Sequence, residues 1–282
     1  MINYYLITKP GIVLGNLITL AAGFLLASKG NINIYLFLAT LMGLAFVMAS
    51  ACVFNNYIDR PLDKKMERTK NRALVTGLIS GQNALLFATL LGFFGFGILF
   101  YFTNLLTVAV AAFGFFVYVV LYSLWKSKTV YGTAIGSIAG AIPPVVGYCA
   151  VSNRLDIGAI ILFFMMVLWQ MPHFFSIAMY RYEDYKAAQI PVLPLIKGIL
   201  VTKIHMAIYI TCFIAVAALL TYFNYTGYVY LMVTVIAGLA WLGLSLKGFS
   251  ISNNQLWGRQ MFHLSLVLIT VICLVIPFDL VK

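Results

Sequence analysis

Nine apolar segments, each long enough to cross a bilayer, constrain the fold of this chain more than any other feature. A helix needs about 20 predominantly apolar residues to span the hydrocarbon core. Of the 282 residues, 63% are hydrophobic and 9% are charged, whereas soluble domains carry about 25% charged residues. The sequence therefore predicts an all-α, polytopic membrane protein and excludes a soluble or disordered chain. The expected spans are 12–28, 34–58, 84–102, 105–125, 132–151, 157–180, 204–223, 228–247 and 261–279.

Basic residues are divided unevenly between the two ends of these spans. Of the 18 Lys and Arg residues, 15 fall in the N-terminal segment and in the connections that follow spans 2, 4, 6 and 8. Because positively charged loops remain in the cytoplasm, we expect a cytoplasmic N-terminus and an external C-terminus. We interpret residues 1–282 as one nine-span domain. Its long connections, 59–83 and 181–203, are then cytoplasmic and are the expected active-site loops.

Acidic residues are scarce, and five of the seven fall in two short windows. In the first window, NNYIDRPLDKKMERTKNR at 55–72, the side chains of Asn55, Asp59 and Asp63 are spaced by four residues. On a continuous helix this spacing places them on one face. Pro61 predicts that the second span ends or bends near Asp59 and that a second helical piece begins there.

The chemistry of this window is that of a site for a metal and a diphosphate. Oxygen ligands at helical spacing suit Mg²⁺, which takes one or two carboxylates and completes its shell with phosphate and water. The neighbouring bases Lys64, Arg68 and Arg72 are suited to bind phosphate oxygens. A solvated cytoplasmic loop is the alternative. It explains the bases, but it does not explain Asn55 and Asp59 at the end of a long apolar run.

The second window, MYRYEDYKAAQIPVLP at 179–194, carries Glu183, Asp184 and Lys186. Two acids in a loop are common, so this window indicates a metal site only in combination with the first window. Because both windows are expected on the same face of the membrane, Asp184 is a candidate ligand that would complete a metal position. Lys186 is a candidate for charge neutralisation beside it.

Two of the expected spans carry unusual residues. Span 6 contains WQMPHFF at 169–175, in which Gln170, Pro172 and His173 are out of place in an apolar helix. His173 lies about 10 Å below the cytoplasmic end and should face the bundle interior or a cavity. It could ligate haem iron, bond a carboxylate or carry a proton, and a helix–helix hydrogen bond is the structural alternative. Span 5 has glycines at 132, 136 and 140, a ladder that favours close helix packing, followed by a predicted kink at Pro143–Pro144.

The NxxxDxxxD pattern at 55–63, followed by a basic stretch and a second acidic window, resembles the UbiA-type superfamily of intramembrane prenyltransferases. Within it, further blocks resemble the haem-farnesylating branch, the protohaem IX farnesyltransferases or haem O synthases. In this branch Tyr180 takes the place of a first acid in the second motif. The blocks are TKPG at 8–11, VFNNYIDR at 53–60, MERTKNR at 66–72, YGT at 131–133, PPVVGY at 143–148, WQMPHF at 169–174 and DYKAAQIPVLP at 184–194.

The resemblance implies a reaction and a set of site residues. The reaction is transfer of a farnesyl group from farnesyl diphosphate to the 2-vinyl group of haem B with addition of water, which gives haem O. Mg²⁺ is the implied cofactor, held by Asn55, Asp59, Asp63 and Asp184, and the three aspartates are the expected catalytic residues. The expected diphosphate-binding residues are Lys64, Arg68, Arg72 and Lys186, and His173 is a candidate for positioning haem.

The implied surroundings are the bacterial cytoplasmic (inner) membrane, with the lipid bilayer and the two substrates as partners and no nucleic acid. A haem-handling or oxidase-assembly protein is a further possible partner. A prenyltransferase of the same superfamily acting on a quinone precursor such as 4-hydroxybenzoate is the main alternative, although WQMPHF and PVLP favour the haem branch. A transporter is the remote alternative, because it should place ionisable groups near the membrane midplane rather than at one interface.

Overall fold

Helices long and apolar enough to cross a membrane make up most of the molecule. The structure, a computed structural model, describes residues 2–281, and this part of the chain is helical without β-strands, with nine such segments. The protein is therefore an all-α, multi-pass membrane protein, as predicted. The spans are α2 (Pro10–Ser28), α3 (Ile34–Ile58), α5 (Gly81–Phe102), Leu105–Trp125, Gly132–Ser152, α10 (Ile157–Tyr180), α13 (Ile199–Tyr222), Tyr228–Ser250 and Asn254–Phe278.

Several spans consist of more than one helical piece, and short helices precede or connect others. The fourth span comprises α6 (Leu105–Phe116), the π-helix η1 (Val117–Tyr122) and α7 (Ser123–Trp125), and the fifth comprises α8 (Gly132–Gly140) and α9 (Ile142–Ser152). The eighth is α14 (Tyr228–Lys247) with η2 (Gly248–Ser250), and the ninth is α15 (Asn254–Val275) with η3 (Ile276–Phe278). The short helices are α1 (Ile2–Ile7), α4 (Arg60–Asp63), α11 (Tyr182–Ala187) and α12 (Leu193–Ile196).

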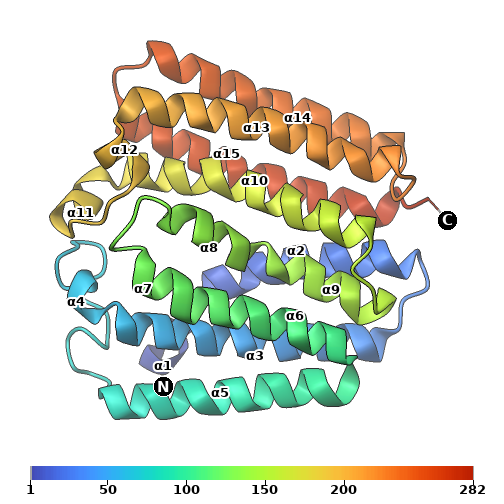
Figure 1. Ribbon diagram of the computed structural model, residues 1–282, viewed down its shortest axis with the longest axis horizontal. Coiled ribbons are helices and arrows are strands. Elements are labelled where there is room, and N and C mark those ends of the chain that lie inside the picture. Colours follow the sequence, from blue (N-terminus) through green and yellow to red (C-terminus); the bar gives the residue numbers. More distant parts are fainter. Residues whose placement is uncertain (1, 282) are drawn as a thin grey trace.

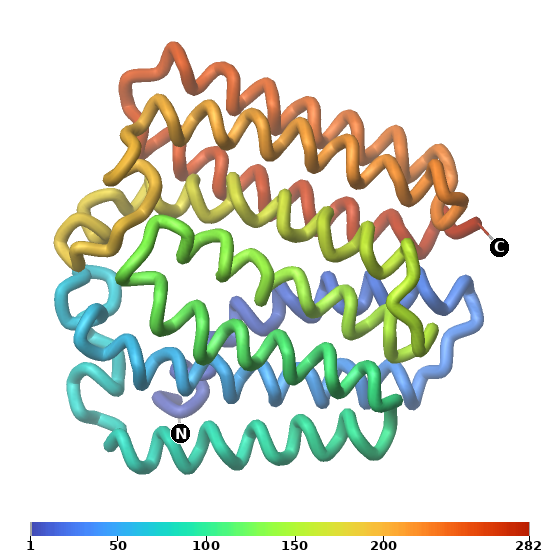
Figure 2. Tube along the Cα trace, in the orientation of Figure 1, coloured from blue at the N-terminus to red at the C-terminus, as the bar shows by residue number. Residues whose placement is uncertain are grey.

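The spans run side by side, and the two long connections meet at one end of the bundle. Helices α4, α11 and α12 all lie at the left end in Figure 1. The opposite end has only short connections and the C-terminal region, as the trace in Figure 2 shows. The two acidic windows therefore share one end of the molecule, as the charge pattern predicted.

Glycines allow the closest helix contacts in the bundle. A Cβ atom on Gly95 of α5 would lie 2.7 Å from the backbone nitrogen of Val47 in α3. A Cβ on Gly23 of α2 would overlap the backbone carbonyl of Pro144 in α9, and one on Gly147 of α9 would overlap the carbonyl of Leu20. Small residues thus allow helix backbones to pack closely. This packing stabilises helix association in lipid, where the hydrophobic effect contributes little.

The predicted breaks near prolines are confirmed. Helix α3 ends at Ile58, and α4 begins at Arg60 with Pro61 in its first turn. Helix α8 ends at Gly140 and α9 begins at Ile142, immediately before Pro143 and Pro144. Both breaks follow from proline chemistry, because the ring has no N–H and clashes with the preceding turn.

Candidate active site

The end of α3 brings the three polar residues of the first window into the protein interior. Asn55, Asp59 and Asp63 are only 2%, 4% and 3% exposed. The Asp59 N–H donates to the Asn55 carbonyl at 2.9 Å, so these two residues are one helical turn apart. The N–H of Asp63 donates to the Asp59 carbonyl at 2.8 Å across the junction with α4. The four-residue spacing therefore survives the break before Pro61.

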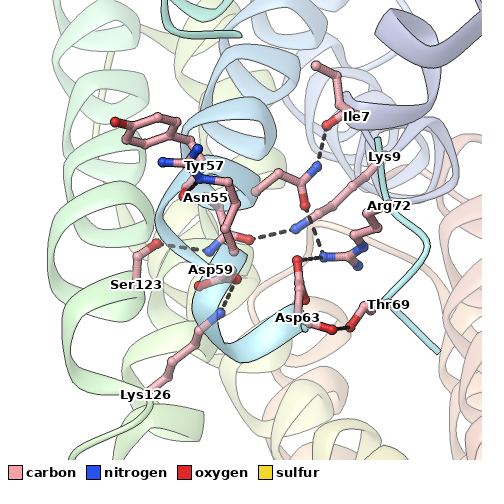
Figure 3. Close-up of polar contacts among 12 residues, drawn as sticks. Ile7, Lys9, Asn55, Tyr57, Asp59, Asp63, Thr69, Arg72, Ser123 and Lys126 are labelled. Atoms are coloured by element: carbon pink, nitrogen blue, oxygen red, sulfur yellow. Dashed lines mark hydrogen bonds and ion pairs between the residues drawn. The ribbon is translucent and has the colours of Figure 1, made fainter. Parts of the chain in front are cut away.

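Each of these side chains contacts a base from another part of the chain (Figure 3). Lys126, just after α7, forms an ion pair with Asp59. The Arg72 Nη1 lies 2.7 Å from Asp63 Oδ2. The Lys9 Nζ donates to Asn55 Oδ1 at 2.6 Å. A buried carboxylate is costly without such partners, so these contacts explain how the acids are accommodated.

Lys9, between α1 and α2, has an unusual backbone conformation. Its φ of 54° lies in the left-handed region, which non-glycine residues rarely adopt. Burial lowers the pKa of the Lys9 ammonium to about 8. Strained backbone of this kind concentrates at functional sites, and here it directs the lysine toward Asn55.

The π-helix η1 positions a second group of side chains. The Ser123 Oγ donates to the Tyr118 carbonyl at 3.0 Å and accepts from Asn55 Nδ2 at 2.9 Å. The rings of Tyr118 and Tyr122 are stacked, with centroids 5.5 Å apart and an interplanar angle of 18°. Insertions of π geometry into α-helices are frequent at functional sites. In this protein the insertion faces both tyrosines and Lys126 toward the end of α3.

These groups enclose a cavity of about 210 Å³ at the connection end of the bundle. Of the residues predicted from sequence, Asn55, Asp59, Asp63, Arg68 and Arg72 line it. Two further lysines that sequence reasoning missed, together with three tyrosines, also line it: Lys9, Lys126, Tyr118, Tyr122 and Tyr185. Four basic side chains thus face two carboxylates, and the excess of positive charge suits a polyanion such as a diphosphate.

One oxygen in this cluster is unused. Asp59 Oδ1 is buried and has no hydrogen-bond partner among the residues that the structure describes. Such atoms are rare in folded proteins and commonly mark a missing ligand or ion. Within residues 2–281, no three His, Cys, Asp or Glu side chains form a ready metal cluster. A cation here would therefore rely on Asn55, Asp59 and Asp63 together with substrate oxygens.

Comparison with known proteins assigns the chain to a family and agrees with this fold. The model of the UbiA prenyltransferase family matches residues 16–267. This chain belongs to the UbiA prenyltransferase family. It is 61% identical to the Protoheme IX farnesyltransferase of Protochlamydia amoebophila (strain UWE25), over 100% of both chains. It is 53% identical to the Protoheme IX farnesyltransferase of Serratia proteamaculans (strain 568), over 99% of this chain and 95% of that protein.

Solved structures of the UbiA type share the fold at low sequence identity. A structure of digeranylgeranylglyceryl phosphate synthase superposes with a TM-score of 0.80 at 18% identity, covering 98% of this chain and 96% of that one. A UbiA homolog from Archaeoglobus fulgidus bound to GPP and Mg²⁺ superposes with a TM-score of 0.65 at 18% identity, covering 98% of this chain and 99% of that one. At these identities the likeness establishes the fold alone.

The second acidic window of this UbiA family member forms a cap over the cavity. Asp184 Oδ1 accepts the backbone N–H of Glu67 at 3.1 Å, which joins the two long connections. An apolar cluster beneath this link comprises Met66, Ala178, Ala188, Ile190 and Val192. Tyr185 reaches the cavity from α11, and burial raises the pKa of its phenol to about 12, so it is neutral at pH 7. Asp184 thus lies at the cap and not in the cavity lining.

The remaining predicted residues lie outside the cavity. Lys64 and Lys186 are exposed beside α4 and in α11. His173 Nδ1 lies 2.7 Å from Ser265 Oγ on α15, and its imidazole is stacked on Trp169 with centroids 4.6 Å apart. This is the helix–helix contact that the sequence left open as an alternative. Roles for these three side chains in binding diphosphate or haem stay predictions.

The two lysines were missed for different reasons. Lys9 is part of the TKPG block, but its partner Asn55 is 46 positions away. Lys126 is 67 positions from Asp59, in a connection where basic residues are expected for topology alone. The only available signal was the apolar-to-basic boundary after the fourth span, and it does not distinguish Lys126 from the exposed Lys128.

Proposed function

We propose that this chain transfers a farnesyl group from farnesyl diphosphate to the 2-vinyl group of haem B, with addition of water, to give haem O. The observation that carries the proposal is the buried pairing of Asp59 with Lys126 and of Asp63 with Arg72 at one end of an apolar bundle. The relatives named Protoheme IX farnesyltransferase support farnesyl as the donor group and haem as the acceptor.

The basic residues bind the diphosphate and stabilise its departure. Lys9, Arg68, Arg72 and Lys126 all face the cavity. Negative charge grows on the diphosphate as the C–O bond to the farnesyl group breaks, and preorganised cations stabilise that charge. Lys64 and Lys186 add positive charge at the entrance, where the substrate arrives from the cytoplasm.

The residues of the cavity also fit Mg²⁺, the cation bound with GPP or DMAPP in the Archaeoglobus fulgidus homolog. We propose Asn55, Asp59 and Asp63 as its ligands, with Asp184 contributed by the cap. The unpartnered Asp59 Oδ1 is the observation that favours this assignment. When bound, the metal neutralises diphosphate charge and assists departure of the leaving group.

Aromatic rings and the cap control what happens after the C–O bond breaks. The stacked aromatic rings of Tyr118 and Tyr122 line the cavity, where aromatic groups stabilise an allylic cation. Ile190 and Tyr185 close the cavity from the cytoplasmic end and limit attack by bulk water. The vinyl group of haem then reacts in preference to solvent. No nucleophilic side chain of the enzyme is needed in this series of reaction steps.

We further propose the arrangement of the chain in the membrane. Residues 1–282 form one domain in the bacterial cytoplasmic membrane, with the N-terminus and both acidic windows in the cytoplasm. This orientation follows from the excess of Lys and Arg at that end. Haem enters through the bilayer or from a haem-handling protein, and His173 contributes to positioning it. The water-soluble diphosphate head reaches the cavity from the cytoplasm.

A reconstituted assay tests the proposed reaction. Purified protein in lipid vesicles is supplied with Mg²⁺, farnesyl diphosphate and haem B, and mass spectrometry of the extracted haem should show haem O. A parallel reaction contains 4-hydroxybenzoate and a longer polyprenyl diphosphate. The Asp59→Ala variant should lose at least 100-fold in rate, whereas Asp156→Asn, at the opposite end of the bundle, should retain activity. Product from the quinone-precursor pair alone would refute the haem assignment.

A further inference from the structure

Three glycines of α8, spaced by four residues, each lie against a residue of another segment. These three contacted residues form a row that leads inward from the cavity. Gly132, which lines the cavity, is followed on the same helix face by Gly136 and Gly140. A Cβ atom on Gly132 would lie 2.7 Å from Lys126 Cα, and one on Gly136 would lie 3.0 Å from the Tyr122 ring. A Cβ on Gly140 would overlap the side-chain amide of Gln170. The row therefore runs from Lys126 through Tyr122 to Gln170.

Gln170 is a buried polar side chain with an unused donor. It is 4% exposed, and its Nε2 atom finds no hydrogen-bond acceptor anywhere in residues 2–281. It lies ten residues from the end of α10, at Tyr180, or about 15 Å along the helix, near the membrane midplane. Phe174 and Ala178, four and eight residues further on the same helix face, line the cavity. Polar groups at this depth are costly and are usually functional.

The break between α8 and α9 leaves a backbone acceptor beside this donor. Pro143 and Pro144 have no N–H, so they cannot donate to the carbonyls of Ala139 and Gly140 four residues earlier. Gly140 lies against the Gln170 amide, because a Cβ on Gly140 would overlap it, so the backbone of Gly140 is close to this donor although no hydrogen bond joins them. An unpartnered amide donor beside the Gly140 backbone, whose carbonyl receives no N–H from Pro144, is a polar site suited to a single water molecule.

We propose that Gln170 and the broken end of α8 position the water that is consumed in the second half of the reaction; the inference rests on the proposed function. The farnesyl C–O bond breaks with its electron pair on the diphosphate, and the π-electrons of the haem vinyl group form a bond to the farnesyl carbon. This leaves a cation on the inner vinyl carbon. The positioned water donates a lone pair to that carbon and its proton passes to a diphosphate oxygen. Gln170 is thus a positioning residue for hydration.

The test separates hydration from farnesyl transfer. Gln170→Met removes the amide at similar volume, and Gly140→Ala displaces it without removing it. Both variants should still release diphosphate and attach farnesyl to haem. The ratio of hydrated product to product lacking water, measured by mass spectrometry, should fall at least tenfold, because the unquenched cation loses a proton instead. Ser245→Ala, which changes another buried unpartnered oxygen but on α14, is the matched control and should keep the wild-type ratio.

Two results would overturn the inference. One is a wild-type product ratio in either variant that still attaches farnesyl. The other is a proportional loss of both products in both variants, which indicates a packing role. A wild-type protein that attaches no farnesyl to haem refutes the proposed function instead, so the two failures are distinguishable.

Discussion

At the scale of single residues, the site depends on charges that are paired across long sequence distances. Asp59 and Asp63 are buried, and each has a cationic partner in the free protein. Removing one partner from such a pair leaves an uncompensated charge, which is more costly than the pair is stabilising. In the function proposed above, a metal bound by the carboxylates would leave the same cations available to the diphosphate. The pairs therefore keep acidic and basic side chains together at a position suited to a charged ligand.

Lys126 should be the most sensitive of the newly found residues. We expect Lys126→Met to lower the rate of farnesyl transfer at least 100-fold, because it removes a cation from both Asp59 and the leaving diphosphate. Lys126→Arg should retain part of the rate. Steady-state assays with saturating haem measure this, and Lys128→Met, at an exposed neighbour, is the control. A Lys126→Met rate within threefold of the wild type would contradict the assignment.

Lys9 should impose an alkaline limit on substrate binding. Its pKa is lowered to about 8, chiefly by burial, so the ammonium form is lost as the pH rises through that value. The KM for farnesyl diphosphate should therefore increase above about pH 8 in the wild-type protein. Lys9→Arg keeps its charge and should shift this increase to higher pH. KM measured from pH 6.5 to 9.5 for both proteins checks the prediction. Identical profiles would exclude Lys9 as the titrating group.

The sequence predicted those site residues that are close to one another along the chain and lie on one helix. Asn55, Asp59 and Asp63 were predicted because four-residue spacing is a property of one helix. Lys9 and Lys126 could not be ranked above other bases, because tertiary packing alone brings them to α3. Asp184 was predicted at the correct end of the bundle, but its contact with the Glu67 backbone depends on the fold of both loops. The sequence identified Gln170 only as a polar residue that is unusual in an apolar span.

At the scale of secondary-structure elements, the apolar segments predicted the spans but not every helix boundary. Helices α5, α13 and α15 begin at Gly81, Ile199 and Asn254, before the predicted apolar starts at 84, 204 and 261. Hydropathy measures the bilayer-spanning part, whereas α5 and α15 begin where a side-chain cap satisfies their first N–H groups and α13 begins after Gly198, which has a positive φ. Ser80 accepts from the Asn83 N–H in this way, and Asn253 accepts from Leu256.

The π-helix η1 is the element whose geometry the site needs most. Deleting Val119, within η1, should restore α-helical register and rotate the following residues by about 100°. Lys126 and Ser123 would then face away from α3, and farnesyl transfer should fall to background while membrane insertion is retained. Val119→Ala, which keeps the length, is the control. The prediction is wrong if the deletion variant inserts normally and transfers farnesyl at the control rate.

The cap can be tested through Asp184, because two roles for this residue make different predictions. Asp184→Asn keeps an oxygen that can accept the Glu67 N–H but removes the negative charge. If Asp184 is a metal ligand, as we propose, the Mg²⁺ concentration for half-maximal activity should rise about tenfold. A magnesium titration of initial rates measures this. Unchanged magnesium dependence, with activity lost only in Asp184→Ala, would assign the residue to closure of the cap.

At the scale of the whole molecule, the cavity is lined by the first, second, fourth, fifth and sixth spans and their connections, without α5. Its lining extends from Lys9 to Val192, and no residue of α13, α14 or α15 takes part. These three helices instead support the bundle. Trp257 of α15 is fully buried, for example, and donates to the Leu244 carbonyl of α14 at 2.9 Å. The charged end and the apolar bundle together suit a substrate with a diphosphate head and a hydrocarbon tail.

The membrane orientation can be tested with cysteine labelling. Asn31 and Ser252 are exposed in connections at opposite ends of the bundle. In intact spheroplasts, a membrane-impermeant maleimide should label Asn31→Cys, and Ser252→Cys should react only after the membrane is permeabilised. The four natural cysteines give the background, of which Cys212 alone is exposed among the described residues. The reverse labelling pattern would invert the proposed topology.

The pairing of Asp59 with Lys126 also has a consequence for biosynthesis. The two residues are 67 positions apart, so the ribosome completes the second span well before the lysine emerges. During this interval the carboxylate has no partner and must stay at the hydrated interface. We therefore expect the third and fourth spans to enter the bilayer beside the second while it is still held at the insertion machinery. This buried ion pair would then also report that the second and fourth spans have assembled correctly in the membrane.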